Sequence, residues 1–164
     1  MNEDRSNIYT FEEILDQYGM LTYRTQGVSM RPMLRSMRDI VSIRRKGEQR
    51  CSLHDVVLYK RGQKYILHRI IGVRPNDYVI LGDNCFTKEY GITDADILGV
   101  LDSFVRNGRT YTVEDKRYRR YVHWLIRLQP VRTALARGRF QVRQALKKIG
   151  PVRWLYYKLK GRAD

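Results

Sequence analysis

The sequence predicts a mainly β protein, α+β overall, whose core is a curled, barrel-like antiparallel sheet. A short helix precedes this sheet, and a basic helical tail follows it. Several short apolar runs separated by turn residues, with no helical pattern between them, predict the strands. Asn107-Gly108 between two of these runs is typical of a tight hairpin. We therefore divide the chain into a helical segment at 1–19, a β core at 20–113 and the tail at 114–164.

The N-terminal helix is predicted over residues 10–19. Thr10 and Glu13 have the spacing of a capping box, and Gly19 is a typical C-terminal stop. The apolar residues of this helix share one face, and they are Phe11, Ile14, Leu15 and Tyr18. Strands are predicted at 21–26, 40–44, 55–60, 65–73, 78–82, 97–105 and 109–113.

The tail becomes helical near residue 115, where apolar side chains recur every three or four residues. The first stripe consists of Tyr118, Tyr121, Leu125 and Leu128. Pro130 suits the start of a second helix. The stripe of that helix consists of Val131, Leu135, Val142, Leu146 and Ile149. Gly150-Pro151 then interrupts the pattern, which continues at Val152, Leu155, Tyr156 and Leu159.

Charge is distributed unevenly along the chain, whose formal net charge is +15. Residues 1–102 hold 15 basic and 14 acidic side chains. Residues 103–164 hold 17 basic and 3 acidic side chains. Because nearly all of the excess positive charge lies in the last third, we expect the tail to have a function of its own.

Composition excludes several classes of protein. The 164 residues, 43% of them hydrophobic, suffice for one domain with a buried core and an appendage. No apolar run is long enough to span a bilayer, and residues 1–6 lack the apolar stretch of a secretory signal. Cys51 and Cys85 are too few for a disulfide framework, and the scattered Cys and His residues predict neither a metal site nor a cofactor.

Three segments of the predicted β core contain a hydroxyl, an imidazole and a carboxylate, on Ser29, His68 and Asp83. A serine hydroxyl becomes a nucleophile when a base removes its proton, and a third group can fix the tautomer of that base. From spacing alone, a purely structural role remains an alternative for each residue. Ser29 and Asp83 would then be turn residues, and His68 a half-buried strand residue.

Five segments occur in an order that is itself informative. They are Ser29-Met30-Arg31-Pro32, Asp39-Ile40-Val41-Ser42-Ile43, Asp55-Val56-Val57-Leu58-Tyr59, Gly82-Asp83-Asn84 and Ile97-Leu98-Gly99-Val100. In this order they resemble the signal peptidase I family and its wider clan, which includes the self-cleaving LexA-type repressors. His68 stands before Arg69 where most bacterial members have lysine. The chain is therefore similar to the histidine-type branch found in the endoplasmic reticulum, in archaea and in some spore-forming bacteria.

The resemblance implies a signal-peptidase/LexA-type β core and a serine endopeptidase that cleaves signal or leader peptides. In this interpretation Ser29 is the nucleophile, His68 is the general base, and Asp83 orients His68. Glu89 stands at the position of the family's second acid, where Asp is usual. No cofactor or metal is implied.

The resemblance also implies how a peptide would bind. An extended peptide pairs with a strand edge, and pockets select its small side chains. Gly27 stands where many members have a serine or threonine that donates to the oxyanion, so we expect backbone amides near Ser29 to take this role. We assign Gly27, Val28 and Met30 to substrate and oxyanion contacts, with Met33 as a further pocket residue. Ordinary core packing is the alternative for the apolar residues.

The tail combines basic side chains with Trp and Tyr, which suits the surface of an anionic membrane. We expect peripheral membrane association without a transmembrane span, and the missing export signal favours the cytoplasmic face. Nucleic-acid binding is the rival interpretation of the tail, because basic and aromatic residues also bind phosphate backbones. In a third, purely structural interpretation, the apolar stripe of the tail packs on the β core and the charged side chains are solvated.

Two other classes of function remain open from the sequence. One is an inactive or regulatory relative of the LexA type, although too few residues precede the core for a helix-turn-helix unit. The other is a nucleic-acid-binding or adaptor module that acts through the tail. In that case Ser29 and His68 would be incidental.

Overall fold

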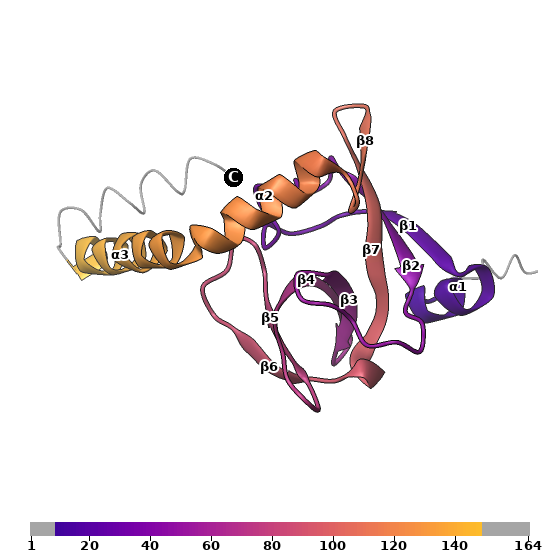
Figure 1. The fold of residues 1–164 in the computed structure, drawn as a ribbon. Coiled ribbons are helices and arrows are strands. Elements are labelled where there is room, and N and C mark those ends of the chain that lie inside the picture. Colours follow the sequence, from indigo (N-terminus) through magenta and orange to yellow (C-terminus); the bar gives the residue numbers. More distant parts are fainter. Residues whose placement is uncertain (1–8, 149–164) are drawn as a thin grey trace, which may run out of the picture. The chain divides into compact units, whose positions relative to one another are not determined.

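A computed structural model describes residues 9–148, and Figure 1 shows their fold. Helix α1 precedes the strands, and helices α2 and α3 follow them. The helices are α1 (Phe11–Tyr18), η1 (Asp94–Asp96, a 3-10 turn), α2 (Lys116–Arg127) and α3 (Gln129–Lys148). The strands are β1 (Met20–Arg24), β2 (Ile40–Arg45), β3 (Val56–Arg61), β4 (Lys64–Val73), β5 (Tyr78–Leu81), β6 (Glu89–Ile92), β7 (Ile97–Arg106) and β8 (Arg109–Thr112).

The described strands form one antiparallel sheet in the order β1-β2-β7-β3-β4-β5-β6, and β8 pairs with β7 as a hairpin. Register shifts at Ser42/Ile43, Leu58/Tyr59 and Ile70/Gly72 interrupt the ladders. Such bulges increase local twist and bend a sheet. The sheet nevertheless stays open, because β1 pairs only with β2 and β6 pairs only with β5 among the described strands. The expectation of a mainly antiparallel, α+β fold is confirmed, whereas a closed barrel is not formed.

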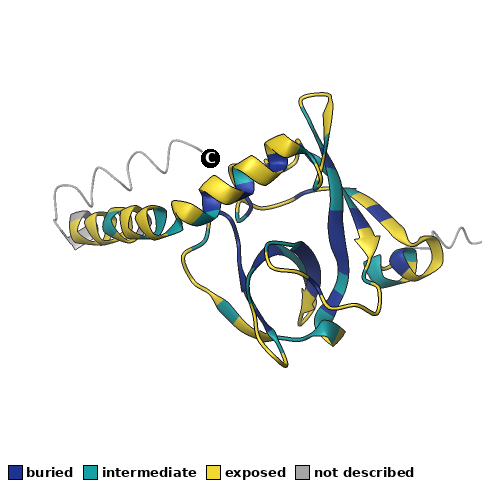
Figure 2. Cartoon of the chain, viewed as in Figure 1, coloured by how far each residue is buried: buried dark blue, intermediate teal, exposed yellow. Residues whose placement is uncertain are grey.

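The core lies around the central strand β3, where Val56, Val57, Leu58 and Tyr59 are all buried. A continuous buried run requires cover on both faces of a strand. In β4 and β5, Ile70, Tyr78 and Ile80 join Val57 and Tyr59 in one apolar cluster. Figure 2 shows these strands as the most buried part of the chain. The sheet thereby fixes the positions of β3, β4 and β5, on which the candidate site is built.

Helix α1 forms as the sequence predicts. The Thr10 side chain accepts a hydrogen bond from the Glu13 amide, and the Glu13 carboxylate accepts one from the Thr10 amide. Gly19 ends the helix in the left-handed region at φ 70°, where glycine avoids the steric cost of a Cβ. Of the predicted apolar face, Leu15 is the buried member.

The predicted strands are all present, with ends that differ by one or two residues. Strand β6 was not predicted, because Glu89-Tyr90-Gly91-Ile92 lacks both an apolar run and clean alternation. Gly91 adopts a positive φ of 75° within it. This short strand proves important, since it carries Glu89.

The chain divides into two compact units between Trp124 and Leu125, a position inside α2. Tyr118 and Val122 of α2 are buried, so the first turns of this helix belong to the unit that contains the sheet. The predicted start of the second tail helix near Pro130 is confirmed by α3. Gly150-Pro151, Ile149 and the third predicted stripe lie outside the described residues.

Helix α3 presents apolar side chains to solvent on an otherwise basic helix. The residues that are more than half exposed are Val131, Leu135, Phe140 and Val142. None of the helices within residues 9–148 has the length and apolarity needed to cross a membrane.

Candidate active site

Side chains from three parts of the chain line one cavity of about 980 Å³. Ser29 comes from the loop between β1 and β2, His68 from β4, and Glu89 from the start of β6. The structure thus brings together the predicted nucleophile and the predicted base, which are far apart in sequence. The wall also includes Cys85, which follows the Gly82-Asp83-Asn84 segment.

The Ser29 turn is held by hydrogen bonds from the Gly82-Asp83-Asn84 segment. The Asn84 amide donates to the Ser29 carbonyl at 2.6 Å, and Asn84 Nδ2 donates to the Val28 carbonyl at 3.2 Å. On the other side of the turn, the Gly27 amide donates to Ser36 Oγ at 3.1 Å. Gly27 has a positive φ of 87°, which an L side chain rarely adopts. The turn that carries Ser29 is therefore fixed at both ends.

Gly82 allows this segment to approach both Ser29 and His68 closely. A Cβ at this position would lie 2.9 Å from His68 Nε2, 2.9 Å from the Ser29 carbonyl oxygen and 2.8 Å from Cys85 Sγ. Real Cβ atoms almost never approach so closely, so only glycine fits here without displacement. His68 Nε2 and the Ser29 backbone are consequently neighbours across one buried glycine.

The other ring nitrogen of His68 faces a carboxylate. His68 Nδ1 lies 3.0 Å from Glu89 Oε1 and 3.3 Å from the Tyr59 hydroxyl. Glu89 Oε2 accepts hydrogen bonds from the Tyr59 hydroxyl at 2.8 Å and from Arg61 at 2.7 Å. An ionised carboxylate only accepts hydrogen bonds, so the proton of the neutral ring belongs on Nδ1. Nε2 is then left with a free lone pair, as a general base requires.

Burial lowers the pKa of His68 below its ordinary value of 6.5, although the Glu89 carboxylate opposes this shift. The side chain is 9% exposed, so the neutral ring is favoured near neutral pH. Burial and the Glu89 carboxylate raise the pKa of Tyr59, so this phenol remains a hydrogen-bond donor. Both directions agree with a neutral imidazole and a protonated phenol beside the Glu89 side chain.

Asp83 takes a different position from the one expected. Its carboxylate binds Arg69 through two hydrogen bonds of 2.9 Å, from Nε and Nη2, and both side chains are 1% exposed. Its Oδ2 also accepts a hydrogen bond from Tyr121 of α2 at 3.1 Å. Successive side chains of a strand point to opposite faces, so Asp83 pairs with Arg69 on the face opposite to His68, although its charge still acts on His68. The structure thus pairs Glu89 with His68 and Asp83 with Arg69, so Glu89 is the candidate that could orient His68, whereas the role predicted for Asp83 stays a prediction.

The residues assigned to substrate contacts are divided by the structure. Gly27 and Met30 line the cavity with Ser29, although Met30 is 5% exposed and belongs to the buried core as well. Val28 is half exposed and does not line this cavity. Met33 lies elsewhere, with its sulfur 3.3 Å from Arg69 Nη2. Met33 thus packs on the Arg69–Asp83 pair and does not form a pocket of this site.

Sequence reasoning missed Tyr59, Arg61 and Cys85 as neighbours of His68. Strand pairing could have revealed the first, because Val57 pairs with His68 and Tyr59 lies two residues further on the same face of β3. Within residues 9–148 no group of three or more His, Cys, Asp or Glu side chains is placed to hold a metal ion. The side chains present can carry out proton transfer and nucleophilic attack without one.

No protein-family model matches the sequence, and no curated protein matches it significantly. The fold and the site therefore define the chain by themselves, as an open antiparallel β protein with a serine, a histidine and a glutamate around one cavity.

Proposed function

We propose that this protein is a serine endopeptidase that cleaves signal or leader peptides, as the resemblance to the histidine-type signal peptidases implies. One observation carries the proposal. Ser29 and His68 share a cavity, and His68 places Nδ1 against Glu89 and Nε2 on the side of the Ser29 backbone. A polarised imidazole beside a serine is the arrangement that activates a hydroxyl for acyl transfer.

In the proposed reaction, His68 Nε2 removes the Ser29 hydroxyl proton while Oγ attacks the peptide carbonyl. Glu89 stabilises the imidazolium that forms. His68 then gives the proton to the leaving amine. In the second half of the reaction, His68 removes a proton from water as the water attacks the acyl carbonyl, and it returns this proton to Ser29 Oγ as the acyl group leaves. No hydrogen bond joins Ser29 Oγ to His68 within residues 9–148. Such catalytic hydrogen bonds often tighten only when substrate binds.

The developing negative charge on the substrate oxygen needs donors. Gly27 provides no side chain for this, and its amide is occupied by Ser36. Within residues 9–148 the amides of Ser29 and Met30 donate to no protein acceptor, so they are available for this role. The backbone near the nucleophile is the candidate oxyanion hole.

We expect an extended peptide to bind in the cavity. Two stretches of backbone contribute to its lining, Thr25-Gln26-Gly27 and Tyr65-Ile66-Leu67 of β4. Main-chain pairing with such a segment binds a peptide with little demand on its sequence. Apolar wall residues such as Met30 and Leu34 would then select small side chains.

We further propose that an anionic membrane surface is the partner of the tail. Helix α3 combines arginines with exposed Val131, Leu135 and Phe140. Exposed aliphatic side chains gain from contact with acyl chains, whereas they gain little from a nucleic-acid backbone. A peptidase held in this way would meet membrane-bound precursors.

The peptidase proposal is tested with a fluorophosphonate probe, which labels activated serines and needs no known substrate. We expect labelling of Ser29, identified by mass spectrometry, and its loss in Ser29→Ala and His68→Ala. Ser52→Ala, an exposed serine outside the cavity, serves as the matched control and should label normally. Cleavage of Ala-x-Ala peptides should follow the same pattern. Labelling or cleavage that survives Ser29→Ala refutes the assignment.

A further inference from the structure

A second cavity, of about 490 Å³, lies between the β7–β8 hairpin and the first turns of α2. It is separate from the candidate active site, and all of its lining residues belong to the unit that contains the sheet. Three arginines line it, Arg106, Arg109 and Arg117. Within residues 9–148 its lining includes no Asp or Glu, although the Asp39 carboxylate is near enough to interact with Arg106.

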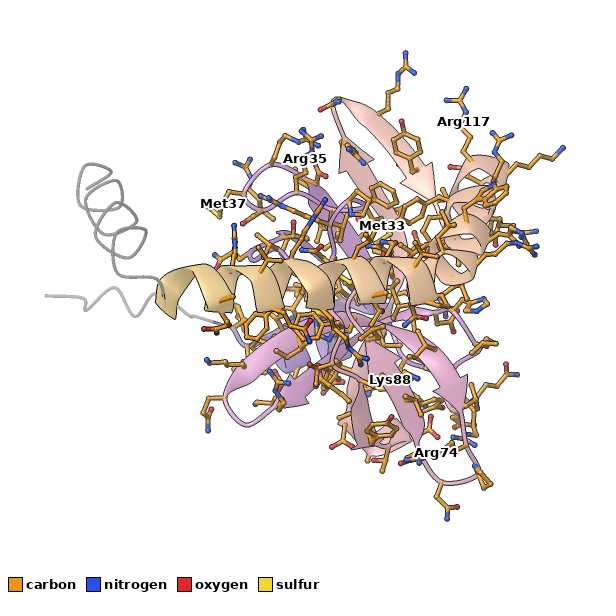
Figure 3. All side chains as sticks on the ribbon, turned by 90° about the vertical axis from the view of Figure 1, so that its left-hand side faces the viewer. Met33, Arg35, Met37, Arg74, Lys88 and Arg117 are labelled. Carbon is orange, nitrogen blue, oxygen red and sulfur yellow. The ribbon has the colours of Figure 1, made fainter. Side chains whose placement is uncertain are left out.

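The arginines are placed together in spite of their charge. Arg106 and Arg109 are direct cross-strand partners on either side of the Asn107-Gly108 turn. Like charges in this position repel each other. Arg117 of α2 adds a third positive charge, and Figure 3 shows it extending from that helix. An anion bound between the three guanidinium groups would attract each of them and so offset their mutual repulsion.

No carboxylate within residues 9–148 forms an ion pair with any of the three. Arg106 Nη1 donates to the carbonyls of Pro32 and Met33, which holds its guanidinium in place. Tyr111 is stacked on Phe104 with ring centroids 5.2 Å apart, and both side chains line the cavity. Arg106 is held by its carbonyl contacts, whereas Arg109 and Arg117 are exposed at the mouth of the cavity, and guanidinium groups can bind phosphate oxygens in pairs.

We propose that this cavity binds the phosphate of an anionic lipid headgroup. The inference deepens the proposed membrane attachment and is independent of peptidase activity. A lipid source is favoured because α3, which begins two residues after α2 in the chain, exposes aliphatic side chains to solvent. The unit with the active site would then contact the membrane through its own residues.

The test measures binding of the full chain to phosphatidylcholine vesicles with and without phosphatidylglycerol. The pocket variant is Arg109→Gln/Arg117→Gln. The control is Arg44→Gln/Lys88→Gln, two exposed residues outside both cavities, which removes the same charge. Each basic residue in contact with an anionic surface strengthens binding to it. We therefore expect the pocket variant, which loses two such residues, to bind the anionic vesicles at least about tenfold more weakly. The affinity of the control variant for the vesicles should change about twofold or less, because its two residues act only through the net charge of the protein.

A competitor makes the test specific to the pocket. Glycerol phosphate, added at constant ionic strength, should displace the wild-type chain from vesicles and should affect the pocket variant much less. Displacement of both proteins to the same extent overturns the proposal.

The remaining outcomes separate this inference from the membrane proposal. If the wild-type chain does not bind anionic vesicles, both the proposed membrane attachment of the tail and the proposed headgroup site fail. If it binds and the two double variants weaken equally, the tail alone provides attachment and the pocket inference fails. If the pocket variant loses affinity for a single-stranded RNA oligonucleotide while vesicle binding is unchanged, the site is a nucleic-acid site and the lipid assignment is overturned.

Discussion

His68 Nδ1 lies 3.0 Å from Glu89 Oε1, while His68 Nε2 lies beside Gly82 and the Ser29 carbonyl. The histidine is thus polarised from one side and open toward the serine turn on the other. Its sequence neighbour Arg69 binds a different carboxylate, Asp83, in the buried core. Two adjacent residues of β4 therefore contact different carboxylates, Glu89 beside His68 and Asp83 beside Arg69.

Replacing Glu89 by Gln should abolish most of the activity and leave the fold intact. The amide can still contact the ring, but it removes the negative charge that stabilises the imidazolium and fixes the tautomer. We expect kcat to fall ~100-fold or more, by analogy with the third member of a serine triad. Steady-state cleavage assays measure this. Glu48→Gln, an exposed glutamate, is the control, and an unchanged kcat in Glu89→Gln would remove Glu89 from the mechanism.

The pH dependence of activity should reflect His68. Because burial lowers the pKa of His68 below 6.5, its Nε2 stays unprotonated and active to below pH 6.5. In Glu89→Gln the opposing charge is lost, so the acidic limb of kcat/KM should move to still lower pH. A limb above pH 6.5 in the wild type, or a shift upward in the variant, would contradict this account.

The same lowered pKa links His68 to stability. The unfolded chain binds a proton at His68 at a higher pH than the folded chain does. The contribution of the neutral His68 ring to the free energy of unfolding is therefore fully present above pH 6.5. It should fall as the pH decreases through the folded pKa. Urea unfolding of wild type and His68→Gln at several pH values measures this, and the variant should lose part of the acid sensitivity.

Asp83→Asn should destabilise the protein, in contrast to Glu89→Gln. The substitution leaves the buried Arg69 guanidinium without a counter-charge, which costs about 3–5 kcal/mol of unfolding free energy. Urea denaturation gives this value directly. Asp16→Asn, at an ion pair with Arg45 that is more than half exposed on both sides, should have little effect. Equal losses in the two variants would show that the buried pair has no special role.

Gly82→Ala should damage the site through the backbone. The new Cβ would meet His68 Nε2 and the Ser29 carbonyl oxygen at 2.9 Å, so the ring and the serine turn must separate. We expect kcat to fall at least ~100-fold, because small misplacements of reacting groups have effects of this size. Gly47→Ala is the control, since none of the described residues comes within 4 Å of a Cβ there. Full activity of Gly82→Ala would show that the close approach is not required.

Local signals predicted much of the fold correctly. The capping box at Thr10, the Gly19 stop and the Asn107-Gly108 hairpin all depend on residues a few positions apart, and all three are present. Strand β6 escaped prediction because its pattern is weak and its pairing with β5 is decided by the sheet. Closure of the sheet also depends on contacts between its two end strands, which no local pattern contains.

The sequence by itself determined that Ser29 and His68 are candidates for one site, through the order of five motif-like segments, and that positive charge gathers in the tail. Only the tertiary structure decided which acid lies against the histidine. Side chains alternate across a strand, so His68 and Arg69 face opposite ways, and Ile80 pairs with both Ile70 of β4 and Glu89 of β6. That cross-strand row brings Glu89 to His68 and leaves Asp83 to neutralise Arg69, a choice that follows from register and not from sequence spacing.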